Sequence, residues 1–370
     1  MEPLPLYVEV MPLLSRRLTG VGRFTARLLE ALARRRRLRL FTTFDRAGLR
    51  RMDLRPELVC GEEIAIDAPL PMADADVGQW TEELLRRPRR PHRGAASASH
   101  ACVYTMLRPD RRQFAREISI LYDFTPLIVP WCHVAPTRAL FGAFFSTLRL
   151  ADKALAISAA TKHDASWLSS IDPDDVVVAY PGPSLCDQAH ACPDAPPRSR
   201  HLILVVATRE PRKNAGFVVD WFLNSRLLPP DCELCWVGPE GWLSDTARAD
   251  PAGDRTRRAR LTFRGMVSDA QLCALYRRAA FTVYPSWYEG FGFPVLDSLC
   301  HDTPVLCSFN SALKEFALPG VFYFDPGDRR SLDRAYEALV AALPLPVGGD
   351  SLRSTYSWDR LADTVTALCG

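Results

Sequence analysis

Two carboxylates and a glycine-bearing loop stand together in residues 284–298, which have the sequence Y-P-S-W-Y-E-G-F-G-F-P-V-L-D-S. An apolar run ends at Pro285, and Pro294 is a residue type favoured in the first turn of a helix. The N–H groups and the positive dipole end of such a helix suit a phosphate or sugar hydroxyls. Glu289 lies in the loop and Asp297 in the helix, so both can accept hydrogen bonds from the hydroxyls of one ligand. A bare phosphate would be repelled by these acids, which favours a ligand with neutral hydroxyls.

Two adjacent cations follow an earlier apolar run, in residues 206–214, which have the sequence V-A-T-R-E-P-R-K-N. Asn214 is expected to cap the helix that comes next. A diphosphate leaving group gains negative charge as its bond to a sugar breaks, and a preorganised Arg212 and Lys213 would stabilise that charge without a metal ion. The two segments together predict a site for a sugar joined to a diphosphate.

Short apolar runs alternate with helical patterns along both halves of the chain, and these elements must position the two segments. The expected strands of the second half are His201–Ala207, Cys232–Val237, Leu261–Phe263, Phe281–Pro285, Pro304–Cys307 and Val321–Phe324, and the expected helices are Ala215–Leu227, Asp269–Ala280, Pro294–Cys300 and Ser331–Leu343. The first half has expected strands at Leu6–Val10, Leu38–Phe44, Ile118–Tyr122, Ala154–Ile157 and Val176–Tyr180, with helices at Arg23–Arg36 and Ala159–Ser169. Short buried strands spaced by helices predict parallel sheets covered on both faces, with ligands at the carboxyl ends of the strands.

The 370 residues suit two domains, and a proline-rich stretch from Pro181 to Pro197 predicts the boundary. We therefore expect an α/β protein with two Rossmann-like lobes and an interdomain cleft. The predicted parts are an acceptor-side lobe at 1–182, a linker at 183–200, a nucleotide-sugar-binding lobe at 201–352, and a C-terminal helix at 353–370 that packs back on the first lobe.

The pattern E-G-F-G-x-P-V-L-[ED], together with x-E-P-R-K-N, resembles glycosyltransferase family 4, a family of retaining enzymes with the GT-B fold. Mannosyltransferases are common among similar sequences. The resemblance covers most of the chain. Further segments that look like family elements are Thr19–Thr25, Tyr122–Leu127, Ser158–Asp164, Phe263–Ser268 and Tyr356–Trp358.

The resemblance implies a role for each matching residue. Arg212 and Lys213 would bind the diphosphate, Asp297 the ribose hydroxyls, and Glu289 the transferred sugar. The other donor contacts implied are Gly290, Phe291, Gly292 and Phe293 through their amides, Gly20 and Gly22 closing over the phosphate, and Gly265, Met266 and Val267 beside the nucleobase. Transfer would proceed on one face of the sugar, with the departing phosphate helping to deprotonate the acceptor, and with no metal or other cofactor.

Two positions depart from the family pattern. Asp297 is one methylene shorter than the usual glutamate, and Tyr122 stands where the family has histidine. They put the donor sugar and the activity itself in question, and they leave open a catalytically silent protein that binds a nucleotide sugar. A separate alternative is a nucleotide-sugar epimerase or hydrolase of the same fold.

Other residues with chemical potential carry weaker signals. Asp123 ends an expected strand, and we leave open whether it acts on the acceptor side or caps a loop. His100 and His133 both lack partners at metal-ligand spacing, and His100 aligns loosely with a family histidine near the cleft. We interpret Asp74–Asp76, which imitates a metal-binding D-x-D, as a solvated loop, and Cys232–Cys235, a lone C-x-x-C, as a strand edge.

Composition narrows the class of protein further. A formal net charge of +3 is too small to predict a nucleic-acid partner, and the arginine runs lack interleaved aromatic residues. The basic runs Arg34–Arg37 and Arg86–Arg93 are either solvated faces or contacts with an anionic membrane, and we expect the second run to be an exposed loop without regular structure. The sequence shows neither a secretion signal nor an apolar run of membrane-spanning length, and it has eleven scattered cysteines. We therefore expect a cytoplasmic protein, with peripheral binding to the inner face of the membrane as the alternative.

Overall fold

The computed structural model describes residues 4–72, 76–92, 99–185, 198–199, 201–242, 255–344, 347 and 350–370. The chain divides into two compact units. Unit 1 comprises Met1–Phe124, Ala139–Ser184 and Thr355–Gly370, and unit 2 comprises Thr125–Arg138 and Leu185–Ser354. The sequence analysis assigned all of 1–182 to the first lobe, whereas Thr125–Arg138 packs as part of unit 2.

Unit 1 is built on an eight-stranded sheet in the order β4-β3-β2-β1-β5-β6-β7-β8. Its strands are β1 (Leu6–Glu9), β2 (Leu38–Phe41), β3 (Glu62–Ile66), β4 (Arg89–Pro91), β5 (Ala101–Tyr104), β6 (Arg116–Leu121), β7 (Lys153–Ala156) and β8 (Val176–Val178). Its helices are α1 (Gly20–Ala33), α2 (Arg46–Arg51), α3 (Val77–Leu85), α6 (Ala159–Leu168) and α13 (Trp358–Cys369), with short 3-10 turns η1 (Met11–Leu14), η4 (Leu148–Leu150) and η5 (Pro173–Asp175). Six strands run parallel, while β3 and β4 are antiparallel to their neighbours.

The edge strand β4 corrects the expectation that Arg86–Arg93 has no regular structure. Arg89 and Arg90 pair with β3 across from Ile64 and Glu63, and Pro91 ends the strand. Proline is tolerated on an edge strand because its missing N–H can face away from the sheet.

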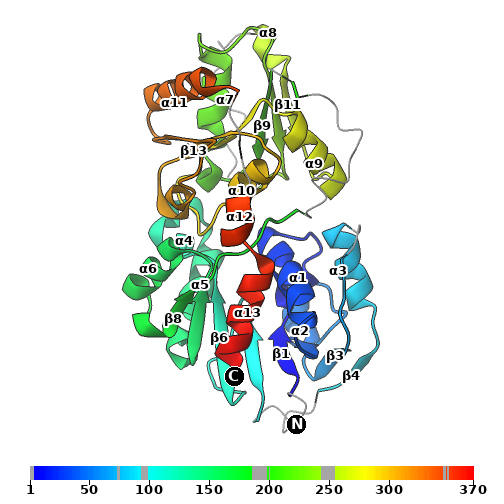
Figure 1. Ribbon diagram of the computed structural model, residues 1–370. Helices are drawn as coiled ribbons and strands as arrows, with labels where there is room; N and C mark the ends of the chain where they lie inside the picture. The colour runs from blue at the N-terminus through cyan, green and yellow to red at the C-terminus, as the bar shows by residue number, and fades with distance from the viewer. Residues whose placement is uncertain are drawn as a thin grey trace. The chain divides into compact units, whose positions relative to one another are not determined.

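The C-terminal helix packs within unit 1, as the sequence predicted. Helix α13 lies along α1, which Figure 1 shows in red beside blue. Arg35 bonds Asp363 at 2.6 Å and Asp359 at 2.9 Å, and Arg34 bonds Asp359 at 3.0 Å. Two arginines of the first basic run therefore hold the end of the chain in place.

Unit 2 contains an entirely parallel six-stranded sheet in the order β11-β10-β9-β12-β13-β14. The strands are β9 (Leu202–Val206), β10 (Glu233–Val237), β11 (Leu261–Arg264), β12 (Phe281–Tyr284), β13 (Val305–Ser308) and β14 (Val321–Phe324). The helices are α4 (Thr125–Ile128), α7 (Ala215–Asn224), α8 (Arg255–Arg258), α9 (Asp269–Arg278), α10 (Phe293–Cys300), α11 (Arg329–Ala342) and α12 (Asp350–Thr355), and the 3-10 turns are η3 (Pro130–Cys132), η7 (Pro211–Lys213) and η9 (Ser311–Glu315). Helix α5 (Ala135–Thr147) begins in the segment that packs with unit 2 and continues into unit 1.

Helices cover both faces of the unit 2 sheet, with α7 and α11 on one face and α9 on the other (Figure 1). Side chains along β10 alternate between two hydrophobic cores, one on each face of the sheet. Trp236 and the preceding Cys232 lie in the core beside α7 and α11, and Cys235 lies in the core beside α9. The two cysteines therefore point into different cores, which agrees with their interpretation as strand residues rather than as a redox or metal pair.

The helix α7 begins differently from the expected capped start. Asn214 adopts a left-handed conformation with φ of 52° and makes no side-chain cap for the helix. Its amide instead donates to the backbone oxygen of Pro326 at 2.9 Å. The sequence analysis was wrong on this cap, because a distant turn competes for the same side chain.

Candidate functional site

The candidate site lies where two neighbouring strands of unit 2 end. Strands β9 and β12 are parallel neighbours, and the chain continues from β9 to one side of the sheet and from β12 to the other. Such a switch in strand order leaves a crevice at the carboxyl ends, which is where open α/β sheets bind ligands. The turn η7 with its two cations follows β9, and the Glu289 loop follows β12.

The structure brings Glu289, Arg212 and Lys213 into direct contact. The Arg212 Nη1 atom lies 2.7 Å from Glu289 Oε2, and the Lys213 Nζ atom lies 2.5 Å from Oε1. Arg212 also pairs with Glu210 at 2.8 Å and donates to the backbone oxygen of Tyr288 at 2.9 Å. The two segments singled out in the sequence therefore form one cluster of two cations and two acids, which we call the ion cluster (Glu210, Arg212, Lys213 and Glu289).

The ion cluster is largely removed from solvent. Glu289 is 7% exposed, and the side chains of Arg212 and Lys213 are 13% and 12% exposed. Burial alone would raise the pKa of Glu289, but the two cations outweigh it and lower that pKa from 4.5 to about 2. Burial and the neighbouring Arg212 lower the pKa of Lys213, against the opposing pull of Glu289. Glu289 is therefore ionised at neutral pH and holds both cations in a fixed geometry.

The backbone of Glu289 is fixed by residues that sequence reasoning missed. Ser311 Oγ accepts the Glu289 amide at 2.9 Å, and the Ala312 amide donates to the Glu289 carbonyl at 3.4 Å. Asn310 donates to the Ser286 carbonyl at 2.9 Å. Ser311 has φ of 43°, a conformation that costs energy for a residue other than glycine and is often found at functional sites. These residues follow β13, far from both motifs in the sequence, so only the sheet order reveals them.

Glycine is required where α10 begins. Gly292 has φ of 130°, and a Cβ atom there would lie 2.7 Å from Leu313 Cδ2. Phe291 is 4% exposed and packs its ring 5.0 Å from Phe293 and 5.4 Å from Phe316. The side chain of Phe291 thus anchors the loop, and the donor contacts expected of the backbone at Gly290, Phe291, Gly292 and Phe293 stay a prediction.

Asp297 lies in α10 and is 2% exposed. Its Oδ1 atom accepts the amide of Leu185, at the start of the linker, at 3.4 Å. The backbone oxygen of Asp297 contacts His301 Nδ1 at 2.7 Å. The structure therefore gives Asp297 a partner in the linker, and its expected role toward ribose stays a prediction.

The remaining donor candidates lie at the start of α1 and in the segment that follows β11. In unit 1, α1 begins at Gly20, and a Cβ at Gly22 would lie 2.8 Å from Leu18 Cδ1, so Gly22 has a packing role of its own. In unit 2, Gly265 follows β11 in open space and Met266 is 54% exposed, while Val267 packs against the core beside α9. The expected contacts with phosphate and nucleobase are untested.

Tyr122 and Asp123 follow β6 in unit 1. The Tyr122 ring packs edge-on against Phe24 at 5.0 Å, and burial raises the pKa of its hydroxyl well above the usual value. Tyr122 thus packs against α1, and the choice between the two interpretations of Asp123 stays open.

His100 lies at the wrong end of the sheet for the site that the sequence analysis considered. It precedes β5, and its ring contacts Tyr7 of β1 at 5.3 Å, near the amino ends of these parallel strands. His100 therefore lies at the end of the sheet opposite the carboxyl ends, where such sheets bind ligands, and its likeness to a family histidine stays a prediction.

The segment Thr125–Arg138 adds a neighbour to the ion cluster. Trp242 Nε1 donates to the Cys132 carbonyl at 2.8 Å, and the His133 ring lies 6.2 Å from the Trp242 ring. Burial raises the pKa of the Cys132 thiol, and the nearby charge of Arg212 opposes that rise. This contact could not be predicted from local sequence, because Cys132 and Trp242 are far apart along the chain.

Metal-binding patterns receive no support from the described part of the chain. Asp76 caps α3 by accepting the Gly78 amide at 2.8 Å, whereas residues 74 and 75 of the D-x-D imitation lie outside the described residues. Among the residues described, no group of three or more His, Cys, Asp or Glu could hold a metal ion. The same residues contain no helix long and apolar enough to cross a bilayer.

Known proteins resemble part of this chain in sequence. Residues 200–342 match the family model of glycosyl transferases group 1. The O-antigen chain mannosyltransferase B of Escherichia coli is 33% identical over 129 residues, which are 34% of this chain and 33% of that protein. The matched region thus spans about a third of that relative's length.

Solved structures share the architecture across the whole chain. Sucrose-phosphate synthase from Thermosynechococcus elongatus aligns with a TM-score of 0.65 at 17% identity and covers 99% of this chain and 98% of its own. HepE from Anabaena, in complex with UDP and glucose, aligns with a TM-score of 0.62 at 13% identity and covers 99% of both chains. At such identities the likeness establishes the fold. Residues 200–342 therefore carry a glycosyltransferase group 1 domain, and the chain as a whole has the GT-B fold.

Proposed function

We propose that this chain transfers mannose from GDP-mannose to a hydroxyl of a saccharide or lipid-linked saccharide acceptor, with retention of configuration. The observation that carries the proposal is the ion cluster at the carboxyl ends of β9 and β12. It places two fixed cations beside an ionised carboxylate at the point where such sheets bind ligands.

The cluster suits departure of a diphosphate. When the bond between the sugar C1 and the diphosphate oxygen breaks, the oxygen gains negative charge, which Arg212 and Lys213 would stabilise. The acceptor hydroxyl forms the new bond to C1 on the same face, and its proton passes to the departing phosphate oxygen. No protein nucleophile and no metal ion are needed in this proposal.

Glu289 would contribute in two ways. Before the donor binds, its carboxylate keeps both cations in place and spares them the cost of isolated buried charge. With the donor bound, it would accept hydrogen bonds from the sugar hydroxyls, while Asp297 would bind the ribose. Because the cations are already ordered, little reorganisation is needed as charge develops.

The choice of mannose and of a surface polysaccharide rests on the relative named as an O-antigen chain mannosyltransferase, which shares part of its length with this chain. The HepE structure was solved with UDP and glucose, which makes UDP-glucose the natural comparison donor. The proposed setting is the cytoplasm, at the inner face of a bacterial membrane.

The test is a transfer assay with either GDP-mannose or UDP-glucose and a saccharide acceptor. We expect Lys213→Ala and Glu289→Ala to lower kcat/KM by at least a hundredfold, about 2.7 kcal/mol of transition-state stabilisation, while both variants remain folded by circular dichroism. Near-normal rates in both variants would remove the proposed mechanism. A wild-type chain that binds donor and never turns it over would instead be a silent binding protein.

We also propose peripheral contact with an anionic membrane surface through the second basic run. Arg86, Arg87, Arg89 and Arg90 are all exposed, whereas Arg93 lies outside the described residues. Arg34 and Arg35 of the first run are engaged by α13, so we assign that run a structural role.

A further inference from the structure

Tyr284 is a buried side chain at the centre of the candidate site to which neither the motifs nor the comparisons assign a role. It is the last residue of β12 and is 3% exposed. Its hydroxyl oxygen lies 2.8 Å from Lys213 Nζ, and the centroid of its ring lies 5.0 Å from the same nitrogen. The Tyr284 side chain therefore meets the ammonium group through its hydroxyl, with the ring close behind it.

The contacts of Lys213 leave one direction open. An ammonium group has three N–H donors. Glu289 Oε1 accepts one at 2.5 Å, and Tyr284 Oη accepts another at 2.8 Å. The described residues supply no third hydrogen bond to Lys213 Nζ. Because two partners fix the rotation of the ammonium group, the remaining N–H has a defined direction toward a ligand oxygen.

The Tyr284 hydroxyl stays protonated in this setting. Burial and the charge of Glu289 raise the pKa of Tyr284 well above its usual value, and a hydrogen bond with Glu289 adds to this effect. Its lone pairs can therefore receive the Lys213 N–H.

We propose that Tyr284 is a positioning residue that orients the Lys213 ammonium group toward the departing diphosphate and keeps it protonated. The inference rests on the proposed function and deepens it, since it names the group that prepares Lys213 for the leaving-group oxygen. Without the hydroxyl, burial would disfavour the ammonium more strongly, because one of its two compensating hydrogen bonds would be lost.

The test is Tyr284→Phe, which removes the hydroxyl and retains the aromatic face. We expect kcat to fall roughly tenfold while KM for the donor changes less than about threefold, since the lost contact matters most when charge develops. We also expect the alkaline limb of the kcat profile to move to lower pH by about one unit, because Lys213 would lose its proton more readily. An unchanged kcat with an unshifted alkaline limb would overturn the proposal.

Tyr336→Phe is the matched control. Tyr336 is 8% exposed and packs against Trp221 and Phe281 in the core of the same unit. The substitution also removes one phenol oxygen, away from Lys213, so we expect a wild-type kcat and pH profile from it. Equal losses in the two variants would mean that Tyr284 contributes only to packing.

A double-mutant cycle with Lys213→Arg tests whether Tyr284 acts through Lys213. If Tyr284 acts through Lys213, the double variant loses no more kcat than Lys213→Arg alone, whereas additive losses would contradict the proposal. The proposed function fails separately, when Lys213→Ala and Glu289→Ala retain transfer. Loss of transfer in those variants with a silent Tyr284→Phe would remove this inference alone.

Discussion

Two buried glutamates of this protein lie in opposite electrostatic surroundings. Glu289 faces two cations and is ionised, whereas Glu9, at the end of β1, receives its hydrogen bonds from the Met11 amide at 2.6 Å and the Thr105 hydroxyl at 3.2 Å. The Thr105 hydroxyl also lies 2.7 Å from the Glu9 backbone oxygen and has one proton for both contacts. If the Glu9 carboxyl is protonated, the Thr105 hydroxyl can donate to the Glu9 backbone oxygen and accept the carboxyl proton, so that both contacts are hydrogen bonds. Burial raises the pKa of Glu9 from 4.5 to about 8, so this acid is neutral over most of the physiological range.

Glu9 should therefore make the stability of the protein depend on pH. The unfolded chain releases the proton near pH 4.5 and the folded chain near pH 8, so the stabilisation is fully present below 4.5 and is lost as pH rises to about 8. Within that window we expect the free energy of unfolding to fall by about 1.4 kcal/mol per pH unit through this group. Urea unfolding of the wild type and of Glu9→Gln, from pH 4 to 9, isolates the effect because all other groups titrate in both. Parallel stability curves would show that Glu9 is ionised in the folded state.

Among the structural elements, those with strong hydrophobic patterns could be predicted and those held by distant contacts could not. The expected strand Val321–Phe324 coincides with β14, and Phe281–Pro285 differs from β12 by one residue. The central strand β5 was missed, because its sequence A-C-V-Y has fewer of the β-branched and aromatic residues that mark β14, V-F-Y-F. The position of Thr125–Arg138 in unit 2 depends on tertiary contacts such as the one between Trp242 and Cys132, which no local pattern encodes.

The same limit applied to the candidate site. Glu289, Arg212 and Lys213 could be found because their residue types and loop contexts are distinctive, and the structure brings them together. Tyr284 and Ser311 could not be found in this way, because a tyrosine at the end of a strand and a serine after a strand are common and carry no distinctive pattern. Their importance comes from hydrogen bonds made across the sheet.

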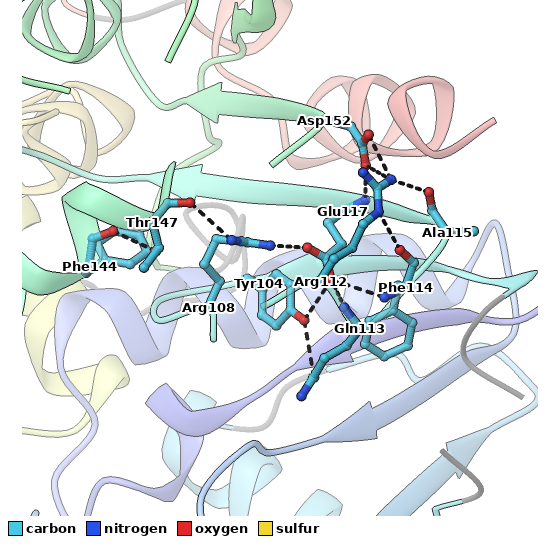
Figure 2. A network of polar contacts seen from close by, with 10 residues as sticks. All are labelled: Tyr104, Arg108, Arg112, Gln113, Phe114, Ala115, Glu117, Phe144, Thr147 and Asp152. Carbon is cyan, nitrogen blue, oxygen red and sulfur yellow. Dashed lines mark hydrogen bonds and ion pairs between the residues drawn. The ribbon is translucent and has the colours of Figure 1, made fainter. Parts of the chain in front are cut away.

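The loop between β5 and β6 is held by a buried polar network that Figure 2 shows in detail. Arg108 and Glu117 form a fully buried ion pair, and Arg108 also donates to the Thr147 carbonyl at the end of α5 at 3.1 Å. The second oxygen of Glu117 accepts the amides of Gln113 and Phe114 at 2.7 and 3.1 Å. The network thus joins the loop to a strand and to a helix of unit 1.

Removing one partner of this pair should destabilise unit 1 strongly. We expect Arg108→Met to lower the free energy of unfolding by about 3–5 kcal/mol, because Glu117 would remain buried without its cation. The matched control is Arg112→Met in the same network, where the Arg112 side chain is 48% exposed and pairs with Asp152, and a loss of at most about 1 kcal/mol is expected. Denaturant unfolding compares the two, and equal losses would mean that burial adds nothing to the Arg108–Glu117 pair.

At the scale of the whole molecule, the formal net charge of +3 is modest, so membrane attraction depends on where the arginines lie. Arg87, Arg89 and Arg90 are exposed on and beside the edge strand β4. Each basic residue near an anionic surface contributes about 1 kcal/mol, which screening reduces as salt rises. A local patch of this kind attracts a bilayer more than the same charges scattered over the surface.

We therefore expect the protein to float with vesicles that contain anionic lipid at low salt, and to be released as salt approaches about 1 M, where the Debye length falls to about 3 Å. Changing Arg87, Arg89 and Arg90 to Gln should weaken binding by about 3 kcal/mol, on the order of a hundredfold. The control changes Arg46, Arg50 and Arg51 of α2 to Gln, which removes the same three charges from exposed positions elsewhere in unit 1. If both triple variants lose binding equally, net charge rather than the β4 edge attracts the membrane. If the wild type does not float at all, the proposed membrane contact is wrong, and the exposed arginines are a solvated face.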